Sequence, residues 1–382
     1  MSSCRVLIVT TEAPDLTFSG LAFFNKIFWQ ELKSRHYDFR TLYLNNQNKP
    51  HSKIADYEIS LEGALPFDST PESDALNKAW TVRSRIQPLL DEYKPDIISA
   101  HENWAALPFF FEMDKVQFTM HASYIGMKHY LARTQKGLQH YWEQRIAVKE
   151  AKAVILHSHW ARKMVQDYVT ADPFAEHIFP IGLKFSDYPS RKIPHPEGKL
   201  VVSFFGRLND SSKNFLIFQK AVMMLPPDLR SRIEPRIYGP GPFASELLSA
   251  GFKGLNYVQG QAKYRAFAET DIVVMPSELE SFGIVGLEAL LSNCTLIATP
   301  GLGMDMYMPQ ECGCAPQPEM IRNRILDYIR NIDELRNKQD SQFYRKSVLK
   351  PEFSVEQMTD HYIRIWEAMY SANQGISDTN NT

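Results

Sequence analysis

Short apolar runs alternate with longer amphipathic stretches along most of the chain. The runs are rich in Val, Ile and Leu, whereas the stretches between them repeat apolar residues at helical spacing. This alternation predicts βαβ units, in which buried parallel strands are connected by helices. The predicted strands of the first half are residues 5–10, 96–100, 116–121 and 153–157, with helices such as 23–34 and 75–93 between them.

A polar segment with three prolines, residues 188–199, interrupts the pattern, which then starts again. We interpret this segment as a linker and predict two α/β halves of similar size that join near residue 190. The polar end of the chain, from about residue 374 to 382, is predicted to be disordered. The predicted strands of the second half are residues 200–205, 236–238, 255–258, 271–275 and 294–298.

Composition narrows the class of protein. A length of 382 residues suits two domains, and 42 Lys+Arg against 44 Asp+Glu leave no basic field for a general nucleic-acid binder. No run of about 20 apolar residues predicts a membrane span, and no signal peptide is apparent, so we expect a cytoplasmic protein. The pair Cys312-Gly-Cys314 lacks zinc spacing, which favours reduced structural thiols. Aromatic residues reach 12%, and composition does not say whether they face core, sugar or lipid.

Chemically useful residues follow several predicted strands directly. Gly206 and Arg207 come after one strand, Glu280 follows another, and His121 ends a strand of the first half. Ligands of open α/β folds bind at the carboxyl ends of the strands, so these residues predict a binding site. A lone histidine is otherwise more often a satisfied core residue.

The segment 276–290, PSELESFGIVGLEAL, predicts a buried strand end, a turn and a helix that starts near residues 281–282. Backbone N–H groups of Phe282, Gly283 and Ile284 would point out of such a helix start and suit a phosphate. Glu280 precedes the helix, and Glu288 lies little more than one turn into it. Taken alone, the two glutamates could equally be ordinary helix residues.

The segment resembles the E-x7-E signature of family 4 glycosyltransferases, which are retaining enzymes of the two-domain GT-B fold. Other segments resemble the same family in order along the second half, and weaker resemblance continues in the first half. The second-half segments are FFGRL at 204–208, RIYGPGP at 236–242, residues 258–277, TPGLG at 299–303 and residues 352–366. The first-half segments are TFSGL at 17–21, and residues 116–121, 153–158 and 180–183.

The resemblance implies a GT-B fold, with two Rossmann-like domains facing a central cleft. It implies an N-terminal acceptor-binding domain at 1–190, which a C-terminal helix at about 355–373 crosses back to join. The nucleotide-sugar-binding domain is then 191–354.

The resemblance also implies roles for site residues. Glu280 and His121 would be catalytic and contact the donor sugar, and Glu288 would hold the ribose. Arg207 and Lys213 would clamp the diphosphate, an arrangement that charge-assisted hydrogen bonds favour. The remaining expected donor-binding residues are Gly20, Gly206, Phe282, Gly283 and Ile284.

The implied reaction moves a sugar from a nucleotide diphosphate sugar to an acceptor hydroxyl by front-face attack, with retention. No Asp-x-Asp pair occurs, so we expect neither a metal nor another cofactor. A G-x-G-x-x-G fingerprint after a strand is also missing, which disfavours a hydride-transfer enzyme. Alternatives on the same fold are a phosphorylase, a nucleotide-sugar epimerase or a non-catalytic nucleotide-sugar-binding subunit.

The sequence indicates less about the acceptor than about the donor. Residues 121–145 mix basic and aromatic side chains, which suits a membrane interface or a lipid-linked acceptor; an ordinary solvated helix is the alternative. Glu102, after another strand end, is a candidate acceptor-side residue. The family resemblance suggests a glycan, lipid-linked or other hydroxyl acceptor in bacterial surface glycan synthesis.

Overall fold

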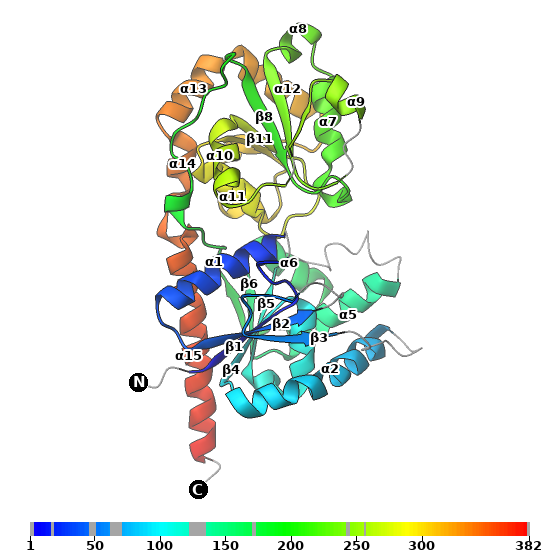
Figure 1. Cartoon of the computed structure of the whole chain (residues 1–382), viewed down its shortest axis with the longest axis vertical. Helices are drawn as coiled ribbons and strands as arrows, with labels where there is room; N and C mark the ends of the chain where they lie inside the picture. The colour runs from blue at the N-terminus through cyan, green and yellow to red at the C-terminus, as the bar shows by residue number, and fades with distance from the viewer. Residues whose placement is uncertain are drawn as a thin grey trace. The chain divides into compact units, whose positions relative to one another are not determined.

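The computed structural model describes residues 4–16, 19–45, 51–61, 71–121, 135–169, 173–241, 245–255 and 257–379. The chain divides into two compact units, Met1–Gly182 with Val355–Thr382 (unit 1) and Leu183–Ser354 (unit 2) (Figure 1). The division falls before the predicted join near residue 190. The segment after residue 182 belongs to unit 2 because Arg345 donates to the carbonyls of Phe185 and Tyr188.

Unit 1 is built on a sheet of parallel strands in the order β3-β2-β1-β4-β5-β6-β7. The four predicted strands are confirmed to within one or two residues. The strands are β1 (Val6–Thr10), β2 (Phe39–Asn45), β3 (Tyr57–Ser60), β4 (Ile97–His101), β5 (Val116–Met120), β6 (Ala153–Leu156) and β7 (Glu176–Ile178).

Helices cover this sheet, and α15 joins it from the far end of the sequence. α1 packs against α15, which also contacts β4, while α2 packs against α5 (Figure 1). Met358, Tyr362 and Trp366 are fully buried at intervals of four residues along α15, so one face of that helix is core. The helices are α1 (Gly20–Ser34), α2 (Pro71–Tyr93), α3 (Asn103–Ala106), η1 (Leu107–Lys115), α5 (Gln135–Glu150), α6 (His159–Tyr168) and α15 (Val355–Thr379).

The end of the chain corrects one prediction. Residues 374–382 were expected to form a disordered tail, but α15 continues as a helix to Thr379. Polar composition misled the prediction, since a helix already nucleated by a long buried face extends into polar sequence at little cost. Residues 380–382 lie outside the described residues.

Unit 2 holds a second parallel sheet, in the order β10-β9-β8-β11-β12. Its strands are β8 (Leu200–Phe205), β9 (Ile233–Tyr238), β10 (Lys253–Leu255), β11 (Ile272–Met275) and β12 (Thr295–Ala298). Its longer helices are α7 (Phe215–Met223), α10 (Gly260–Glu269), α11 (Ile284–Leu291), α12 (Pro318–Arg330), α13 (Ile332–Asp340) and α14 (Phe343–Val348), with short helices α8 (Pro227–Arg230) and α9 (Ser245–Ser249).

Two adjacent phenylalanines show how β8 is sandwiched. Phe204 packs on Phe215 and Phe218 of α7, with ring centroids 5.4 and 5.9 Å away. Phe205 points to the other face and stacks on Phe267 of α10 at 4.4 Å. Successive side chains of a strand face opposite sides, so helices on both faces make both residues core. The continuous apolar run of β8 follows from that double burial.

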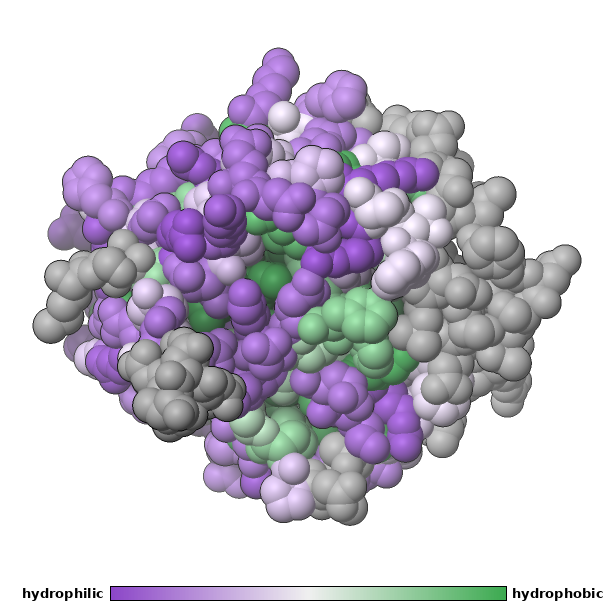
Figure 2. All heavy atoms as spheres, turned by 90° about the horizontal axis from the view of Figure 1, so that it is seen from below, coloured by the Kyte–Doolittle hydropathy of each residue, from purple (hydrophilic) through white to green (hydrophobic). Residues whose placement is uncertain are grey.

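The aromatic excess goes largely into these cores. Tyr43, Phe118, Tyr362 and Trp366 are among the largest fully buried side chains. A smaller group is exposed on unit 1, where Trp80 lies edge-on to Phe111 at 5.5 Å and the two side chains are 64% and 69% exposed. Figure 2 shows one face of the molecule, on which limited apolar areas lie among predominantly polar side chains.

The four cysteines are buried and form no disulfide bonds, in agreement with structural thiols. They are Cys4, Cys294, Cys312 and Cys314. Burial raises the pKa of the Cys312 thiol to about 12, so that sulfur stays protonated at neutral pH. Within the described ranges, no helix combines the length and apolar character that a membrane crossing requires.

Candidate functional site

The loop that follows β8 begins with Gly206 and Arg207. The amide of Gly206 donates to the carbonyl of Tyr238 at 3.0 Å, which extends the pairing of β8 with β9 to the start of the loop. Arg207 pairs with Asp210 at 2.7 Å and keeps half of its side chain exposed. Burial would raise the pKa of the Asp210 carboxyl, but hydrogen bonds from Ser212 and Arg207 outweigh it and lower that pKa. The guanidinium is thus held in place while still open to an anion.

Lys213 and Glu280 form the central contact of unit 2. Lys213 ends a short 3₁₀ turn, Ser211–Lys213, and its Nζ lies 2.6 Å from Oε1 of Glu280. Ser277 donates to the same carboxylate oxygen at 3.1 Å. Glu280 is 9% exposed, so its charge requires these partners. The pair joins the loop after β8 to the loop after β11.

Two further bonds connect these loops. The amide of Glu278 donates to the carbonyl of Ser212 at 2.9 Å, and Asn214 Nδ2 donates to the carbonyl of Pro276 at 3.0 Å. Asn214 itself has a left-handed backbone, with φ 54°, at the point where the 3₁₀ turn gives way to α7. The 3₁₀ turn thereby positions the ammonium group of Lys213 beside the carboxylate of Glu280.

The start of α11 is set by Gly283. The helix begins at Ile284, two residues later than predicted, because Gly283 adopts a left-handed φ of 78° as its N-cap. A Cβ on Gly283 would lie 2.5 Å from Cγ of Met304. The hydroxyl of Tyr307 also donates to the Gly283 carbonyl. Glycine is required here for both backbone angle and space. In the first turn of α11 the amide of Gly286 donates to the Gly283 carbonyl at 2.9 Å, and the amides of Ile284 and Val285 precede this first bond of the helix.

Glu288 lies within α11 with no exposed surface. Its Oε1 accepts from the hydroxyl of Tyr188 at 3.0 Å, and its Oε2 lies 2.7 Å from Nζ of Lys263 on α10. Burial, with the negative charge of Glu288, raises the pKa of Tyr188 and keeps that hydroxyl a donor.

In unit 1, His121 follows β5 and belongs to a histidine cluster. Its Nε2 lies 2.9 Å from Nδ1 of His101, which ends β4. His157, after β6, lies 5.1 Å from His121 between ring centroids and bonds through Nδ1 to the carbonyl of Phe179 at 3.1 Å. Phe24 of α1 contacts all three rings.

Burial dominates the acid–base behaviour of the cluster. It lowers the pKa of His101 to about 3, with a further contribution from His157, and it lowers that of His157 to about 4. Burial and the two neighbouring rings also lower the pKa of His121 well below its usual value. All three imidazoles are therefore neutral at neutral pH and act as hydrogen-bonding groups rather than cations.

Glu102, the acceptor-side candidate, follows β4 with a left-handed φ of 84°. Burial raises the pKa of its carboxyl to about 8, and the charges of Glu12 and Glu143 add to this effect. A carboxyl that holds its proton at neutral pH can donate as well as accept a hydrogen bond.

Comparison with known proteins matches each half of the chain to a family model. Residues 30–176 match Glycosyltransferase Family 4, and residues 199–331 match Glycosyl transferases group 1. The chain belongs to the group 1, family 4 glycosyltransferases. This membership agrees with the resemblance of the sequence to family 4 glycosyltransferases.

Two curated relatives of this glycosyltransferase match over part of their length. D-inositol 3-phosphate glycosyltransferase of Geodermatophilus obscurus is 26% identical over 178 residues, 41% of this chain and 39% of that protein. Sulfoquinovosyl transferase SQD2 of Arabidopsis thaliana is 32% identical over 122 residues, 30% of this chain and 22% of that protein. The matches thus span less than two thirds of either relative.

Solved structures resemble almost the whole chain. Sucrose-phosphate synthase of Thermosynechococcus elongatus has a TM-score of 0.78 at 15% identity, covering 97% of this chain and 100% of that one. WaaG, a glycosyltransferase involved in lipopolysaccharide biosynthesis, has a TM-score of 0.70 at 16% identity, covering 94% and 99%. At such identity the likeness concerns the fold alone, which is the predicted GT-B fold of two Rossmann-like domains.

The predicted site residues of unit 2 all follow β8 or β11 along the chain. Gly206, Arg207 and Lys213 come after β8, and Glu280, Phe282, Gly283, Ile284 and Glu288 come after β11, the last two within α11. Unit 1 holds Gly20, the first residue of α1, where Ser19 Oγ accepts from the amide of Ala22 at 3.0 Å. Thr17 and Phe18, which precede Ser19 in the same segment, lie outside the described residues. Unit 1 also holds His121.

Sequence reasoning missed two partners of these residues, Tyr188 and Lys263. His101 directly follows the predicted strand 96–100, so the strand-end rule also selects it, although as a less persuasive candidate than His121; in the structure it is the last residue of β4. Tyr188 was assigned to the linker, and Lys263 lies on a helix far from the motif. Nothing in their spacing signals that both meet Glu288.

The basic and aromatic segment 121–145 is described only in part, because residues 122–134 lie outside the described residues. Its later part belongs to α5. There Arg145 donates to the hydroxyl of Tyr141 at 3.2 Å and lies 5.6 Å from the ring centroid of Trp142. Arg145 thus makes a hydrogen bond and a cation–π contact within its own helix, and Tyr141 also donates to the carbonyl of Tyr168 at 3.1 Å.

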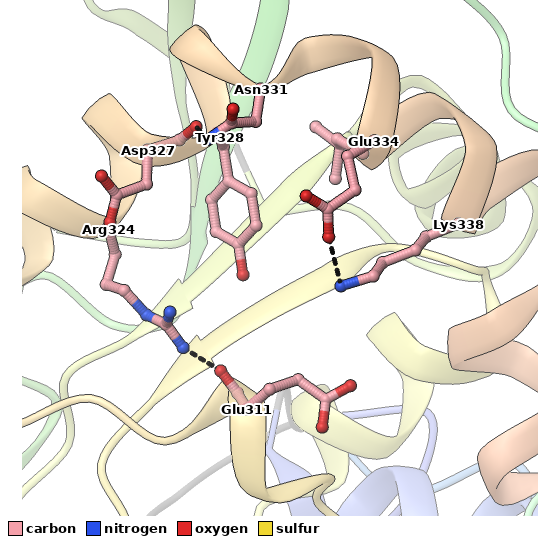
Figure 3. Close-up of a pocket in the computed structure, with 8 residues that line it drawn as sticks. Glu311, Arg324, Asp327, Tyr328, Asn331, Glu334 and Lys338 are labelled. Carbon is pink, nitrogen blue, oxygen red and sulfur yellow. Dashed lines mark hydrogen bonds and ion pairs between the residues drawn. The ribbon is translucent and has the colours of Figure 1, made fainter.

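A cavity of about 150 Å³ opens elsewhere on unit 2, between α12, α13 and the turn Gln310–Cys312 (Figure 3). Two of its cations have partners within the cavity: Lys338 lies 3.0 Å from Glu334, and Arg324 donates to the Glu311 carbonyl. None of the predicted donor residues lines it. The remaining lining residues are Asp327, Tyr328, Asn331 and Leu335.

Proposed function

We propose that this glycosyltransferase moves a sugar from a nucleotide diphosphate sugar to an acceptor hydroxyl, with retention and without a metal. The observation that carries the proposal is the Lys213–Glu280 pair, 2.6 Å apart at the carboxyl ends of β8 and β11. It puts a cation and a hydrogen-bond acceptor side by side where ligands of parallel α/β sheets bind. A diphosphate needs the cation, and a sugar hydroxyl needs the carboxylate.

The most demanding requirement of the proposed reaction is to stabilise the negative charge that develops on the leaving diphosphate. Arg207 and Lys213 supply two positive charges, and the start of α11 adds oriented amide groups and the positive end of a helix dipole. These groups are already positioned by Asp210 and Glu280, so they need little rearrangement to meet developing negative charge. In this proposal the leaving phosphate oxygen takes the acceptor proton, and no side chain serves as a covalent nucleophile.

Glu280 is assigned to hydroxyls of the donor sugar, Glu288 to the ribose and His121 to the sugar. The enclosed position of Glu288 makes its ribose contact an exchange, in which a ribose hydroxyl takes the place of Tyr188 or Lys263. A structural neighbour of the same fold, HepE of Anabaena, was solved with UDP-glucose; it has a TM-score of 0.64 and 16% identity. That likeness supports a nucleotide-sugar donor.

We further propose an acceptor that presents a hydroxyl, on a glycan or a lipid-linked molecule, in bacterial surface glycan synthesis. One relative is a D-inositol 3-phosphate glycosyltransferase, and inositol 3-phosphate carries hydroxyl groups, which supports a hydroxyl acceptor. Contact with the inner face of a membrane stays a prediction from residues 121–145.

A thermal-shift panel of UDP-, GDP- and ADP-sugars tests the donor assignment. A true donor raises the unfolding temperature in proportion to the logarithm of its concentration over its dissociation constant. Glu280→Gln should retain stabilisation by the free nucleoside diphosphate and lose turnover. Glu278→Gln, an exposed neighbour in the same loop, is the matched control and should behave as wild type.

The products separate the alternatives. Free nucleoside diphosphate formed with acceptor supports glycosyl transfer. A sugar 1-phosphate formed with inorganic phosphate would indicate a phosphorylase, and an isomerised donor an epimerase. Stabilisation without any product under all conditions would indicate a non-catalytic subunit.

A further inference from the structure

A chain of buried hydrogen bonds runs through unit 1 from α15 to His121. Trp366 Nε1 donates to Oε1 of Gln117 at 3.3 Å, and Ser99 Oγ donates to the same oxygen at 2.7 Å. Nε2 of His101 lies 3.1 Å from Ser99 Oγ, and Nδ1 of His101 lies 2.9 Å from Nε2 of His121. The first four side chains of this chain are completely buried.

The indole fixes the direction of every bond in the chain. Trp366 has a hydrogen to donate and no lone pair to accept, so Gln117 must turn its carbonyl oxygen toward it. Ser99 uses its one proton on that oxygen and can therefore only accept from His101. His101 then carries its proton on Nε2, which leaves its Nδ1 as an acceptor. The donor facing that Nδ1 is Nε2–H of His121.

The other bonds of Gln117 do not set this direction. Its Nε2 donates to Thr119 Oγ1 at 2.8 Å, and Thr119 Oγ1 lies 3.0 Å from the hydroxyl of Tyr362. A hydroxyl can donate or accept, so both would tolerate a flipped amide. The flipped amide would leave the buried indole N–H without an acceptor, and that cost decides the orientation.

We propose that Trp366 is a positioning residue that selects the Nε2–H tautomer of His121 and leaves Nδ1 free to accept a hydrogen bond from the ligand. Burial lowers the pKa of His121, so the ring is neutral and its tautomer decides what it recognises. An accepting Nδ1 suits a sugar hydroxyl and disfavours a carboxylate, which has no hydrogen to donate. Resting on the proposed function, the inference is that Nδ1 of His121 accepts a hydrogen bond from a hydroxyl of the donor sugar.

The tautomer can be measured directly by long-range ¹H–¹⁵N NMR of the full chain with ¹⁵N-labelled histidine. A His121→Asn spectrum assigns the resonances. The wild type should show Nε2–H in at least about fivefold excess over Nδ1–H, and Trp366→Phe should reduce that excess. Trp29→Phe is the matched control, since Trp29 is also buried in unit 1 and its indole nitrogen has no hydrogen-bond partner among the described residues.

Should Trp366→Phe fail to fold, Ser99→Ala interrupts the same chain while removing a single oxygen atom, and it should also reduce the excess. The proposal is overturned if wild-type His121 carries its proton on Nδ1. It is equally overturned if the folded variant, Trp366→Phe or else Ser99→Ala, keeps the wild-type tautomer ratio.

The ligand part has its own test, in which wild type, Trp366→Phe and Trp29→Phe turn over the donor that the thermal-shift panel identifies. Trp366→Phe should turn it over more slowly than wild type, because less of His121 then presents an accepting Nδ1, while Trp29→Phe should not. Turnover by Trp366→Phe at the wild-type rate would refute the ligand assignment. Turnover of no donor would count against the proposed function and leave the tautomer result standing.

Discussion

Each charged group of the candidate site already has a partner in the folded protein. Lys213 lies on Glu280, Arg207 on Asp210, and Glu288 between Tyr188 and Lys263. Paired charges stay desolvated at modest cost, and a ligand that supplies phosphate oxygens and hydroxyls can take over the same contacts. The site residues thus make stabilising contacts in the folded protein that a bound substrate would later take over.

Lys213 offers the clearest test of the diphosphate clamp. Lys213→Met keeps the aliphatic length and removes the charge, so we expect donor turnover to fall by about 10²–10³-fold, the scale on which preorganised charge stabilisation operates. Steady-state kinetics with the donor found in the panel measures this. Lys220→Met, which removes an exposed lysine from α7, should leave turnover unchanged; a similar fall in both would argue against a specific clamp.

The histidine cluster predicts acid sensitivity. Free histidine in the unfolded chain titrates near pH 6.5, whereas the folded pKa of His157 is about 4. Between these values the unfolded state binds a proton at this histidine that the folded state does not, so the contribution of His157 to stability falls as the pH drops and is constant above about pH 6.5. His157→Gln should lessen the slope of unfolding free energy against pH by about 1.4 kcal/mol per unit.

Chemical denaturation between about pH 6 and pH 4.5 checks this slope. The exposed His159, changed to Gln, should leave it as in wild type. An unchanged slope in His157→Gln would mean that this ring is already charged in the folded protein.

At the scale of single elements, the sequence located most strands because the buried ones are continuous apolar runs. β2, β3 and β7 were missed for different reasons. β2 carries Arg40 and Thr41, which interrupt the run, and β3 and β7 are short edge strands whose residues are only partly buried. Periodicity cannot identify a strand that buries little.

The start of α11 was placed early because apolar pattern alone does not reveal a left-handed cap. Gly283→Ala adds about 1–2 kcal/mol of backbone strain and a collision with Met304, which together should cost roughly 2–5 kcal/mol of unfolding free energy. Gly251→Ala, at a similar φ of 85° but in open space, should cost only the strain. Denaturant titration of both variants makes the comparison, and equal losses would contradict the collision.

The motif residues of the candidate site could be predicted from the sequence, whereas the side chains that contact and position them could not. The strand-end rule and the family pattern identify Glu280, Lys213 and His121. The contacts of Lys263, Tyr188 and Trp366 depend on which helix faces which strand, and that arises only when the whole unit packs. Trp366 lies 245 residues after His121, so no local pattern connects them.

At the scale of the whole molecule, the last helix of the chain, α15, belongs to unit 1. α15 buries Met358, Tyr362 and Trp366 in unit 1, although it follows unit 2 in sequence. Removal of residues 355–382 should therefore speed hydrogen exchange in β4 and β5 of unit 1 and leave β8 and β11 of unit 2 protected. Exchange mass spectrometry resolves these strands. Greater loss of protection in unit 2 would contradict the assignment of α15.

The central claim is that unit 2 binds a nucleotide sugar whose glycosyl group is transferred with the help of Glu280. Release of nucleoside diphosphate from UDP-, GDP- and ADP-sugars, by wild type and Glu280→Gln in parallel, tests it most directly. The account predicts that wild type releases diphosphate from one donor class, and that Glu280→Gln loses this turnover while free nucleoside diphosphate still stabilises it. Undiminished turnover in Glu280→Gln, or release from no donor by wild type, would contradict it.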